Sequence, residues 1–410
     1  MINLHCPFYI IKLADLTKNL CVSLSSCSQY LALKMLFEFF FGEYDSVSHL
    51  IRNNSWTLSE SQFLNLLLGF EGNRFLRRIR FSVLRKYKGE LNPFDFVLAF
   101  DDTDNPKYSK LLSNVQSWRS SKGMYFGQKI LVLALVNIKE KFAIPIDYRI
   151  CLPKKKQNKE KNESAIDLAF ELLLLHSKDF YFIPVVADSW FDSSELAMKL
   201  RENGITYVWE LKSNRKVKCF PGKKQKYFSL HNTFYNLARK CVNTVKNKWI
   251  SEKIIILKSN RMSVKTVATY NRKNGKDAFA YYATNDRSMP GEMVWKIFRA
   301  RWNIESLFRD LKSYLNFGRL STSNDKVNEL AFVIPFIIIA YLRLNPEAFG
   351  LKNKMTVAGM LKTLRTQQDN FTIDSILGGE FLDLIKKIKI RRSRINKKPV
   401  IQGTEVKIAA

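Results

Sequence analysis

Residues 298–312 read FRARWNIESLFRDLK, which is the pattern of one amphipathic helix. At about 100° per residue, one edge of that helix carries Phe298, Arg301, Glu305 and Lys312. A separate apolar stripe, expected to dock on a core, consists of Ile304, Leu307, Phe308, Leu311 and Leu315. A carboxylate, a guanidinium and an ammonium group on one edge suit the binding of a metal ion and phosphate oxygens. The alternative is a solvated edge in which Arg301 and Glu305 form an i,i+4 ion pair.

Two apolar segments upstream of this helix end in acidic residues. Residues 94–103 read FDFVLAFDDT and residues 180–191 read FYFIPVVADSWF, and both runs are typical of buried strands. The first places Asp101 and Asp102 at its tip, and because side chains alternate across a strand, only one of them is expected to face a site. The second ends in Asp188. The simpler alternative is that these acids only end a strand and begin a turn or a helix.

Together these motifs resemble those of insertion-sequence transposases with an Asp-Asp-Glu active site and a Tyr-Arg-Glu-Lys signature helix. The helix edge matches the family spacing aromatic-x2-Arg-x3-Glu-x6-Lys, with Phe298 where the family usually has Tyr. The family pattern Asp-x-Thr matches Asp101 and Thr103, which favours Asp101 over Asp102. The resemblance covers residues 94–345. It implies an α/β fold with an RNase H-like catalytic core, that is, a mixed five-stranded sheet with helices.

The resemblance also implies a chemistry. The catalytic and metal-ligating residues would be Asp101, Asp188 and Glu305. They would hold two Mg²⁺ ions, for which Mn²⁺ could substitute. DNA contacts near the cut would come from Arg301, Lys312 and Phe298. The expected function is a DNA transposase that cuts at the ends of an insertion sequence and joins them to target DNA by two-metal-ion phosphodiester hydrolysis and strand transfer. Two alternatives stay open: an RNase H-like metal-dependent nuclease without joining activity, and a catalytically decayed DNA-binding protein.

The order of the elements agrees with such a core. Strands are expected over 94–101, 125–136, 142–151, 180–187 and 206–211, and helices over 165–176 and 191–203. The three candidate acids would then meet at one end of the sheet.

The chain divides into five parts. These are a helical N-terminal region that could recognise DNA ends (1–90), the first part of the core (91–212), a mostly β insertion (213–287), the core helix with Glu305 and a following buried helix (288–345), and a C-terminal region with a basic tail (346–410). The aromatic residues of the insertion could stack on an extruded base or form its own small core; they are Phe220, Tyr227, Phe228, Tyr235 and Trp249. The apolar run 330–342 is too short to span a bilayer and is expected to be buried.

Composition favours a polyphosphate partner. The formal charge is +30, from 67 Lys plus Arg against 37 Asp plus Glu. The expected partner is double-stranded DNA, as terminal inverted repeats and target, bound by a homodimer that brings two ends together, with no membrane involved. Residues 384–398 hold eight basic side chains, which either contact DNA or form a solvated tail: Lys386, Lys387, Lys389, Arg391, Arg392, Arg394, Lys397 and Lys398. A second basic cluster spans residues 154–161.

The six cysteines are scattered without CxxC spacing. They are expected to be reduced thiols of a cytoplasmic, nucleoid-associated protein. A zinc site formed by His5, Cys6, Cys21 and Cys27 is a weaker alternative.

Overall fold

The computed structural model describes residues 48, 51, 59–68, 72–107, 111–112, 114–120, 123–151, 164–219, 226–241, 248–273, 276–319, 323–352 and 355–376. Three predictions therefore lie outside the described residues: the basic tail, the basic cluster at 154–161 and the zinc alternative near the N-terminus.

One mixed sheet organises the described part of the protein. Its first half has the order β4-β3-β1-β5-β6. β1 (Phe96–Pro106), β3 (Gly123–Asn137) and β4 (Phe142–Cys151) are antiparallel, whereas β5 (Val185–Ala187) and β6 (Tyr207–Leu211) run parallel to β1. Three antiparallel strands followed by two parallel ones, with helices between them, fit an RNase H-like fold. The short β2 (Gln116–Ser120), which the sequence did not predict, pairs with the start of β3.

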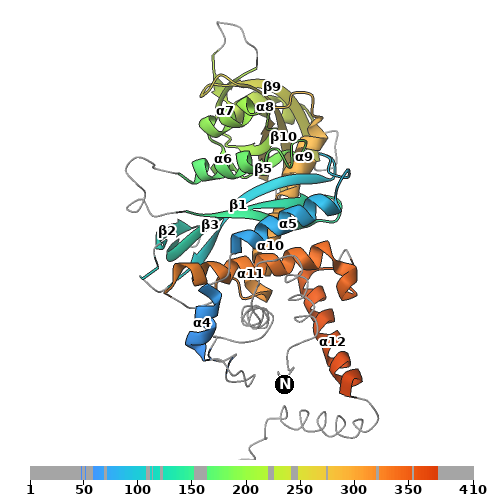
Figure 1. The fold of residues 1–410 in the computed structure, drawn as a ribbon. Coiled ribbons are helices and arrows are strands. Elements are labelled where there is room, and N and C mark those ends of the chain that lie inside the picture. The colour runs from blue at the N-terminus through green and yellow to red at the C-terminus, as the bar shows by residue number, and fades with distance from the viewer. Residues whose placement is uncertain are drawn as a thin grey trace, which may run out of the picture.

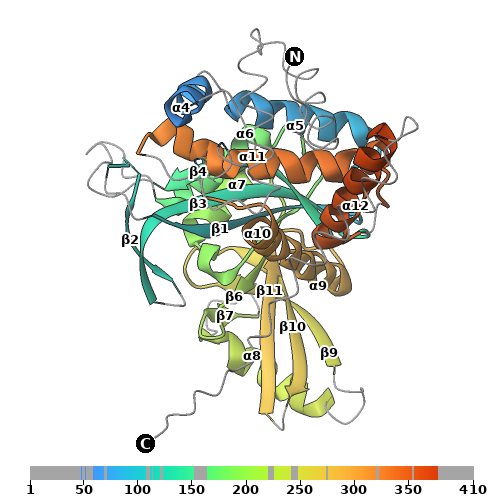
Figure 2. The ribbon, with the colours of Figure 1, turned by 90° about the horizontal axis from the view of Figure 1, so that it is seen from below.

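The sheet continues beyond β6 into residues 213–287. The additional strands are β11 (Lys276–Thr284), β10 (Ser263–Lys273), β9 (Lys248–Leu257), β7 (Lys216–Lys218) and β8 (Phe228–Ser229). β11 pairs antiparallel with β6, so this mostly β stretch prolongs the sheet of the core. An unexpected helix, α8 (Leu230–Cys241), lies beside it. Figure 2 shows these strands extending away from the layer formed by α5 (Gly72–Lys86) and α11 (Asp325–Leu344).

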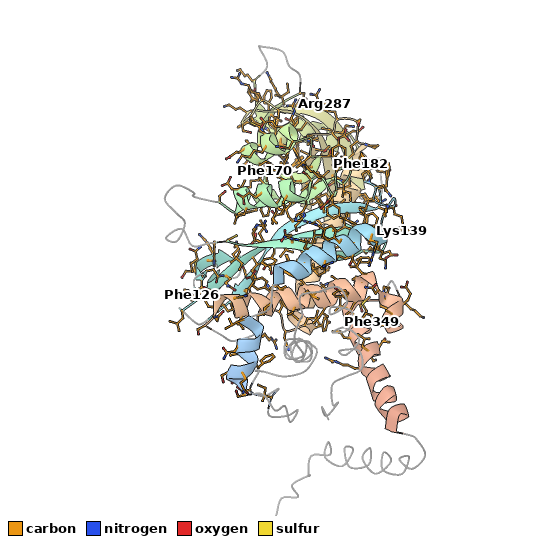
Figure 3. The ribbon with its side chains drawn as sticks, viewed as in Figure 1. Phe126, Lys139, Phe170, Phe182, Arg287 and Phe349 are labelled. Carbon is orange, nitrogen blue, oxygen red and sulfur yellow. The ribbon has the colours of Figure 1, made fainter. Side chains whose placement is uncertain are left out.

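Helices cover both faces of the first half of the sheet. α6 (Ala165–His176) and α7 (Ser194–Glu202) lie on one face, and α5, α10 (Trp302–Tyr314) and α11 lie on the other (Figure 1). α6 begins with a capping box in which Ser164 and Asp167 satisfy each other's backbone N–H groups. Ser193 caps α7, with its side chain accepting from the Leu196 N–H. Side chains fill the space between the sheet and both helix layers (Figure 3).

Three further helices and two 3₁₀ turns complete the described chain. They are α4 (Glu60–Leu68), η2 (Ser189–Phe191), α9 (Gly291–Ala300), η3 (Pro346–Phe349) and α12 (Val357–Ile376). α9 packs on β6, β9, β10 and β11, on the same side of the sheet as α10.

The apolar run at 330–342 belongs to α11, which has 20 residues and is longer than the run itself. Among the described helices, α11 alone is long and apolar enough to cross a membrane, but 89% of its most apolar window is buried inside the protein. The prediction of a buried helix is therefore confirmed, whereas the argument from a short length is wrong. Burial identifies α11 as a core helix.

Residues 298–312 do not form the single helix that was expected. α9 ends at Ala300 and α10 begins at Trp302, with Arg301 at the junction. The Arg301 N–H donates to the Phe298 carbonyl at 3.1 Å, and the Ile304 N–H donates to the Arg301 carbonyl at 2.9 Å. These i,i+3 bonds tighten the backbone where the two helices meet. The predicted apolar stripe is confirmed, because its five members are all buried.

Candidate active site

Asp101 lies on β1 and faces the helix layer that contains α10. Its Oδ2 accepts a hydrogen bond from Arg301 Nη1 at 3.2 Å. Alternation along the strand turns Asp102 to the opposite face, where its Oδ2 forms an ion pair with Lys129 Nζ at 2.9 Å. The sequence left both acids open as the first ligand, and Asp101 is the one that lies beside Arg301.

Asp188 and Glu305 approach the same place from different elements. Asp188 follows β5 and caps η2, with its Oδ1 accepting from the Trp190 N–H at 2.9 Å. Glu305 lies in the first turn of α10, and its Oε1 is 2.6 Å from Arg301 Nη2. β1 and β5 are parallel, and their register pair Ala99–Val186 puts Asp101, in the middle of β1, level with Asp188, which directly follows β5. The structure thus joins Asp101 and Glu305 through Arg301 and places Asp188 close enough to Asp101 for its charge to act on that carboxyl.

The negative charges of the candidate acids are only partly compensated by the positive charge of Arg301. Burial raises the pKa of Asp101 to about 7, the negative charge of Asp188 adds to the rise, and the Arg301 guanidinium opposes it. Two carboxylates that repel each other in a partly desolvated site form an environment that a further cation would stabilise.

The donor chemistry of the site fits a divalent metal. Carboxylate oxygens are the ligands that Mg²⁺ prefers, and a divalent ion would relieve the repulsion between Asp101 and Asp188. Nevertheless, within the part of the chain that the structure describes, no three His, Cys, Asp or Glu residues are already arranged to hold a metal ion. The Arg301 guanidinium bridges Asp101 and Glu305. A metal shared by these two acids through the same oxygens would have to displace Arg301.

Two aromatic rings flank Arg301. Its guanidinium carbon lies 5.6 Å from the centre of the Phe298 ring and 5.5 Å from that of Trp302. Phe298 is 6% exposed and packs on Tyr282, with ring centres 4.3 Å apart. This burial gives Phe298 a supporting position behind Arg301, so a contact between Phe298 and DNA stays a prediction that the structure does not favour. Lys312 is exposed in the last turn of α10.

Three residues near the acids were not singled out from the sequence. Glu210 lies on β6, one position after the Ala187–Trp209 register pair and therefore beside Asp188. Trp190 and Trp302 are 50% and 58% exposed and adjoin the site residues Asp188 and Arg301. A usable signal existed for Glu210, because it is an acid near the end of an apolar strand, as Asp101 and Asp188 are.

The aromatic residues of 213–287 have mixed surroundings. Tyr235 contacts the rings of His231 and Phe279, as a member of a small core would. Phe228 is 55% exposed, and Lys218 and Lys258 lie over the ring of Tyr227. The side chains of Phe220 and Trp249 lie outside the described part. Stacking of any of these rings on an extruded base stays a prediction.

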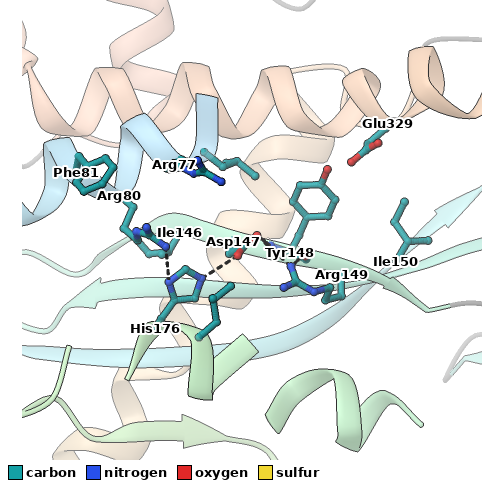
Figure 4. Close-up of a pocket in the computed structure, with 12 residues that line it drawn as sticks. Arg77, Arg80, Phe81, Ile146, Asp147, Tyr148, Arg149, Ile150, His176 and Glu329 are labelled. Atoms are coloured by element: carbon teal, nitrogen blue, oxygen red, sulfur yellow. Dashed lines mark hydrogen bonds and ion pairs between the residues drawn. The ribbon is translucent and has the colours of Figure 1, made fainter. Parts of the chain in front are cut away.

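A cavity of about 760 Å³ lies elsewhere, along the edge of β4 between α5, α6 and α11 (Figure 4). In its wall His176, only 1% exposed, accepts at Nδ1 from Arg80 at 3.1 Å, and its Nε2 donates to Asp147 Oδ2 at 2.8 Å. Asp147 also accepts the Tyr148 N–H, and Arg149 donates to the Tyr148 carbonyl. Asp147 and Arg149 thus satisfy backbone groups of the edge strand β4, which is a structural role.

Residues 141–342 match the family model described as a transposase DDE domain. The match includes Asp188 and Glu305 and begins after Asp101. It supports a transposase of the Asp-Asp-Glu type, and more broadly a transposase or nuclease function, with DNA as partner. Domains of this type generally use divalent metals.

Comparison with curated proteins gave no match. Among solved structures, the chain is similar to Ciona intestinalis endonuclease V in complex with a 24-mer DNA that contains an inosine followed by a ribo-adenosine. That likeness has 11% identity, 56% coverage of this chain, 96% of the other and a TM-score of 0.27. The NurA nuclease from Sulfolobus solfataricus gives 10% identity, 76% and 98% coverage, and a TM-score of 0.23. At these TM-scores neither likeness carries an argument.

Proposed function

We propose that the protein is a DNA transposase that cuts at the ends of an insertion sequence and joins them to target DNA. The observation that carries this proposal is the bridge that Arg301 forms between Asp101 and Glu305, with Asp188 close enough to Asp101 for its charge to raise the pKa of that carboxyl. The family match of residues 141–342 and the RNase H-like strand order support it.

In this proposal Asp101, Asp188 and Glu305 hold two Mg²⁺ ions, with Mn²⁺ as a substitute. When bound, the ions would supply activation of the attacking hydroxyl group and stabilisation of the leaving oxygen in an in-line displacement. The chain itself would position the DNA. Lys312 is exposed in the last turn of α10, and Arg301 lies at the start of that helix beside the acids, so that their positive charge would hold phosphates near the cut.

Exposed aromatic rings would add contacts to unpaired nucleotides at the DNA end. Trp190 and Trp302 combine exposure with positions next to Asp188 and Arg301. Stacking on aromatic side chains is a general way to bind bases outside a duplex. The formal charge of +30 supports binding of long DNA. We further propose that two copies act together on the nucleoid in the cytoplasm, because joining requires two ends at one target.

The test is an incubation of the full-length protein with Mg²⁺, DNA that carries the flanking inverted repeats of its element, and a target plasmid. Strand transfer into the target would support a transposase. Hydrolysis without joining would indicate the nuclease alternative, and retention without cleavage a decayed DNA-binding protein. Asp188→Asn is the matched control, because it removes one charge without a change of shape and should abolish both cleavage and joining.

A further inference from the structure

Glu210 shares the face of the sheet and the electrostatic environment of the candidate active site. β5 and β6 are parallel, and their register places Glu210 beside Asp188. Side chains alternate along β6, so Glu210 lies on the same face as Val208 and opposite Tyr207 and Trp209. α9 packs on β6 close to its junction with α10. Burial raises the pKa of Glu210, the charge of Arg301 lowers it and that of Asp188 raises it, so both groups act on this carboxyl.

The hydrogen bonds of Arg301 are incomplete. Its Nη1 and Nη2 atoms are engaged by Asp101 and Glu305, but its Nε is buried and has no hydrogen-bond partner. The residue is only 8% exposed, so water does not readily replace the missing acceptor. A buried guanidinium with an unsatisfied N–H would gain from another nearby acceptor.

The position of Arg301 also conflicts with metal binding by the acids. Its guanidinium bonds one oxygen of Asp101 and one of Glu305, and its positive charge would repel a divalent ion bound to the same two carboxylates. A divalent ion that took these two oxygens would compete with Arg301, which would then give up at least one of its two carboxylates. A displaced, buried Arg301 needs a new anionic partner.

We propose that Glu210 is a positioning residue that accepts Arg301 when a divalent metal engages Asp101 and Glu305. Arg301 would alternate between a bridge across two metal ligands and a pair with Glu210. This inference rests on the proposed metal-dependent function. It assigns to Glu210 an effect on metal affinity that acts through Arg301 and not through direct ligation.

The proposal can be tested through the coupling between Glu210 and the metal. If Glu210 stabilises only the displaced state of Arg301, it raises metal affinity only in proteins that contain Arg301. The four proteins to compare are the full-length wild type, Glu210→Gln, Arg301→Gln and the double variant. The measurement is Mn²⁺ binding without DNA, by the electron paramagnetic resonance signal of free Mn²⁺. Glu202→Gln is the charge-matched control, because Glu202 is exposed at the end of α7, before β6 begins.

Glu210→Gln should weaken Mn²⁺ binding by about five- to tenfold, the lower range of typical coupling between sites. Arg301→Gln should tighten binding, the double variant should bind as Arg301→Gln does, and the control should match the wild type. An equal loss in both backgrounds would overturn the proposal in favour of direct ligation by Glu210. Absence of any effect of Glu210→Gln would also overturn it.

Asp188→Asn separates this inference from the proposed function. If Asp188→Asn loses Mn²⁺ binding while Glu210→Gln keeps it, the metal site stands and only the role of Glu210 fails. If Asp188→Asn binds Mn²⁺ as tightly as the wild type, the proposed site itself fails. Thermal melting followed by circular dichroism checks that every variant is folded.

Discussion

Two clusters of charged side chains lie on the same sheet and differ in how their charges are balanced. At the edge of β4, His176 is bonded through both ring nitrogens, and Asp147 pairs with both His176 and Arg149. Beside the carboxyl end of β5, by contrast, burial and the charge of Asp188 raise the pKa of Asp101 to about 7. Charged side chains that pair with one another stabilise the packing of their elements. A carboxyl whose pKa is strongly raised beside a second carboxylate is instead a candidate for binding a cation. The cavity belongs to the first cluster and the proposed chemistry to the second.

The largest effect is expected for loss of an acid at the unbalanced cluster. Asp188→Ala and Glu305→Ala should each reduce DNA cleavage by roughly 10³-fold or more, because metal ligands supply several kcal/mol of transition-state stabilisation. DNA affinity should stay largely intact, since basic surfaces supply most of it. Cleavage rates and filter binding, measured on the same preparations, check both points. Near-normal cleavage by either variant would remove that residue from the site.

A pair of neighbouring substitutions sharpens the assignment on β1. Asp101→Asn should be inactive, because Asp101 faces Arg301. Asp102→Asn should keep substantial activity, because Asp102 is paired with Lys129 on the opposite face. Single-turnover cleavage in Mg²⁺ distinguishes them. The reverse result would move the first ligand by one residue.

At the balanced cluster the expected loss is of stability and not of catalysis. His176→Ala removes the acceptor of Arg80 and the donor to Asp147, and should lower the free energy of unfolding by about 2–3 kcal/mol. Urea denaturation measures the loss, and Glu171→Ala on the exposed face of α6 is the control. Cleavage per folded molecule should be unchanged. Loss of cleavage in folded protein would mean that the β4 edge also takes part in the reaction.

A smaller effect tests whether a buried charge alone marks a functional site. Lys107, at the end of β1, donates to the Gly318 carbonyl at 2.6 Å, and burial lowers its pKa to about 8. Between this value and the unfolded pKa of about 10.4 the unfolded chain binds more protons, so stability should rise with pH.

The free energy of unfolding should rise by about 1–2 kcal/mol between pH 7.5 and 9.5. The upper limit for one proton is about 1.4 kcal/mol for each pH unit. Lys107→Met should flatten this rise while cleavage survives, and Lys326→Met, at an exposed lysine, should not flatten it. Urea denaturation at the two pH values is the measurement. An unchanged slope in Lys107→Met would assign the rise to other groups.

Much of the core was predictable because its elements have strong local patterns. The ranges 142–151 and 165–176 were predicted with the bounds that β4 and α6 have. Other elements were missed for a physical reason. β2 is a short polar strand that exists only through its pairing with β3, and the break at Arg301 reflects backbone bonds within a sequence of continuous helical periodicity.

The sequence by itself determined most strands and helices of the core and the candidate acids, because periodicity and side-chain chemistry are local properties. Only the tertiary structure decided that Asp101, and not Asp102, lies beside Arg301, and that Glu210 lies beside Asp188. It also decided that Arg301 bridges Asp101 and Glu305. Those relations depend on strand register and on the packing of α10 against β1, which places Arg301 beside Asp101, 200 positions earlier in the chain.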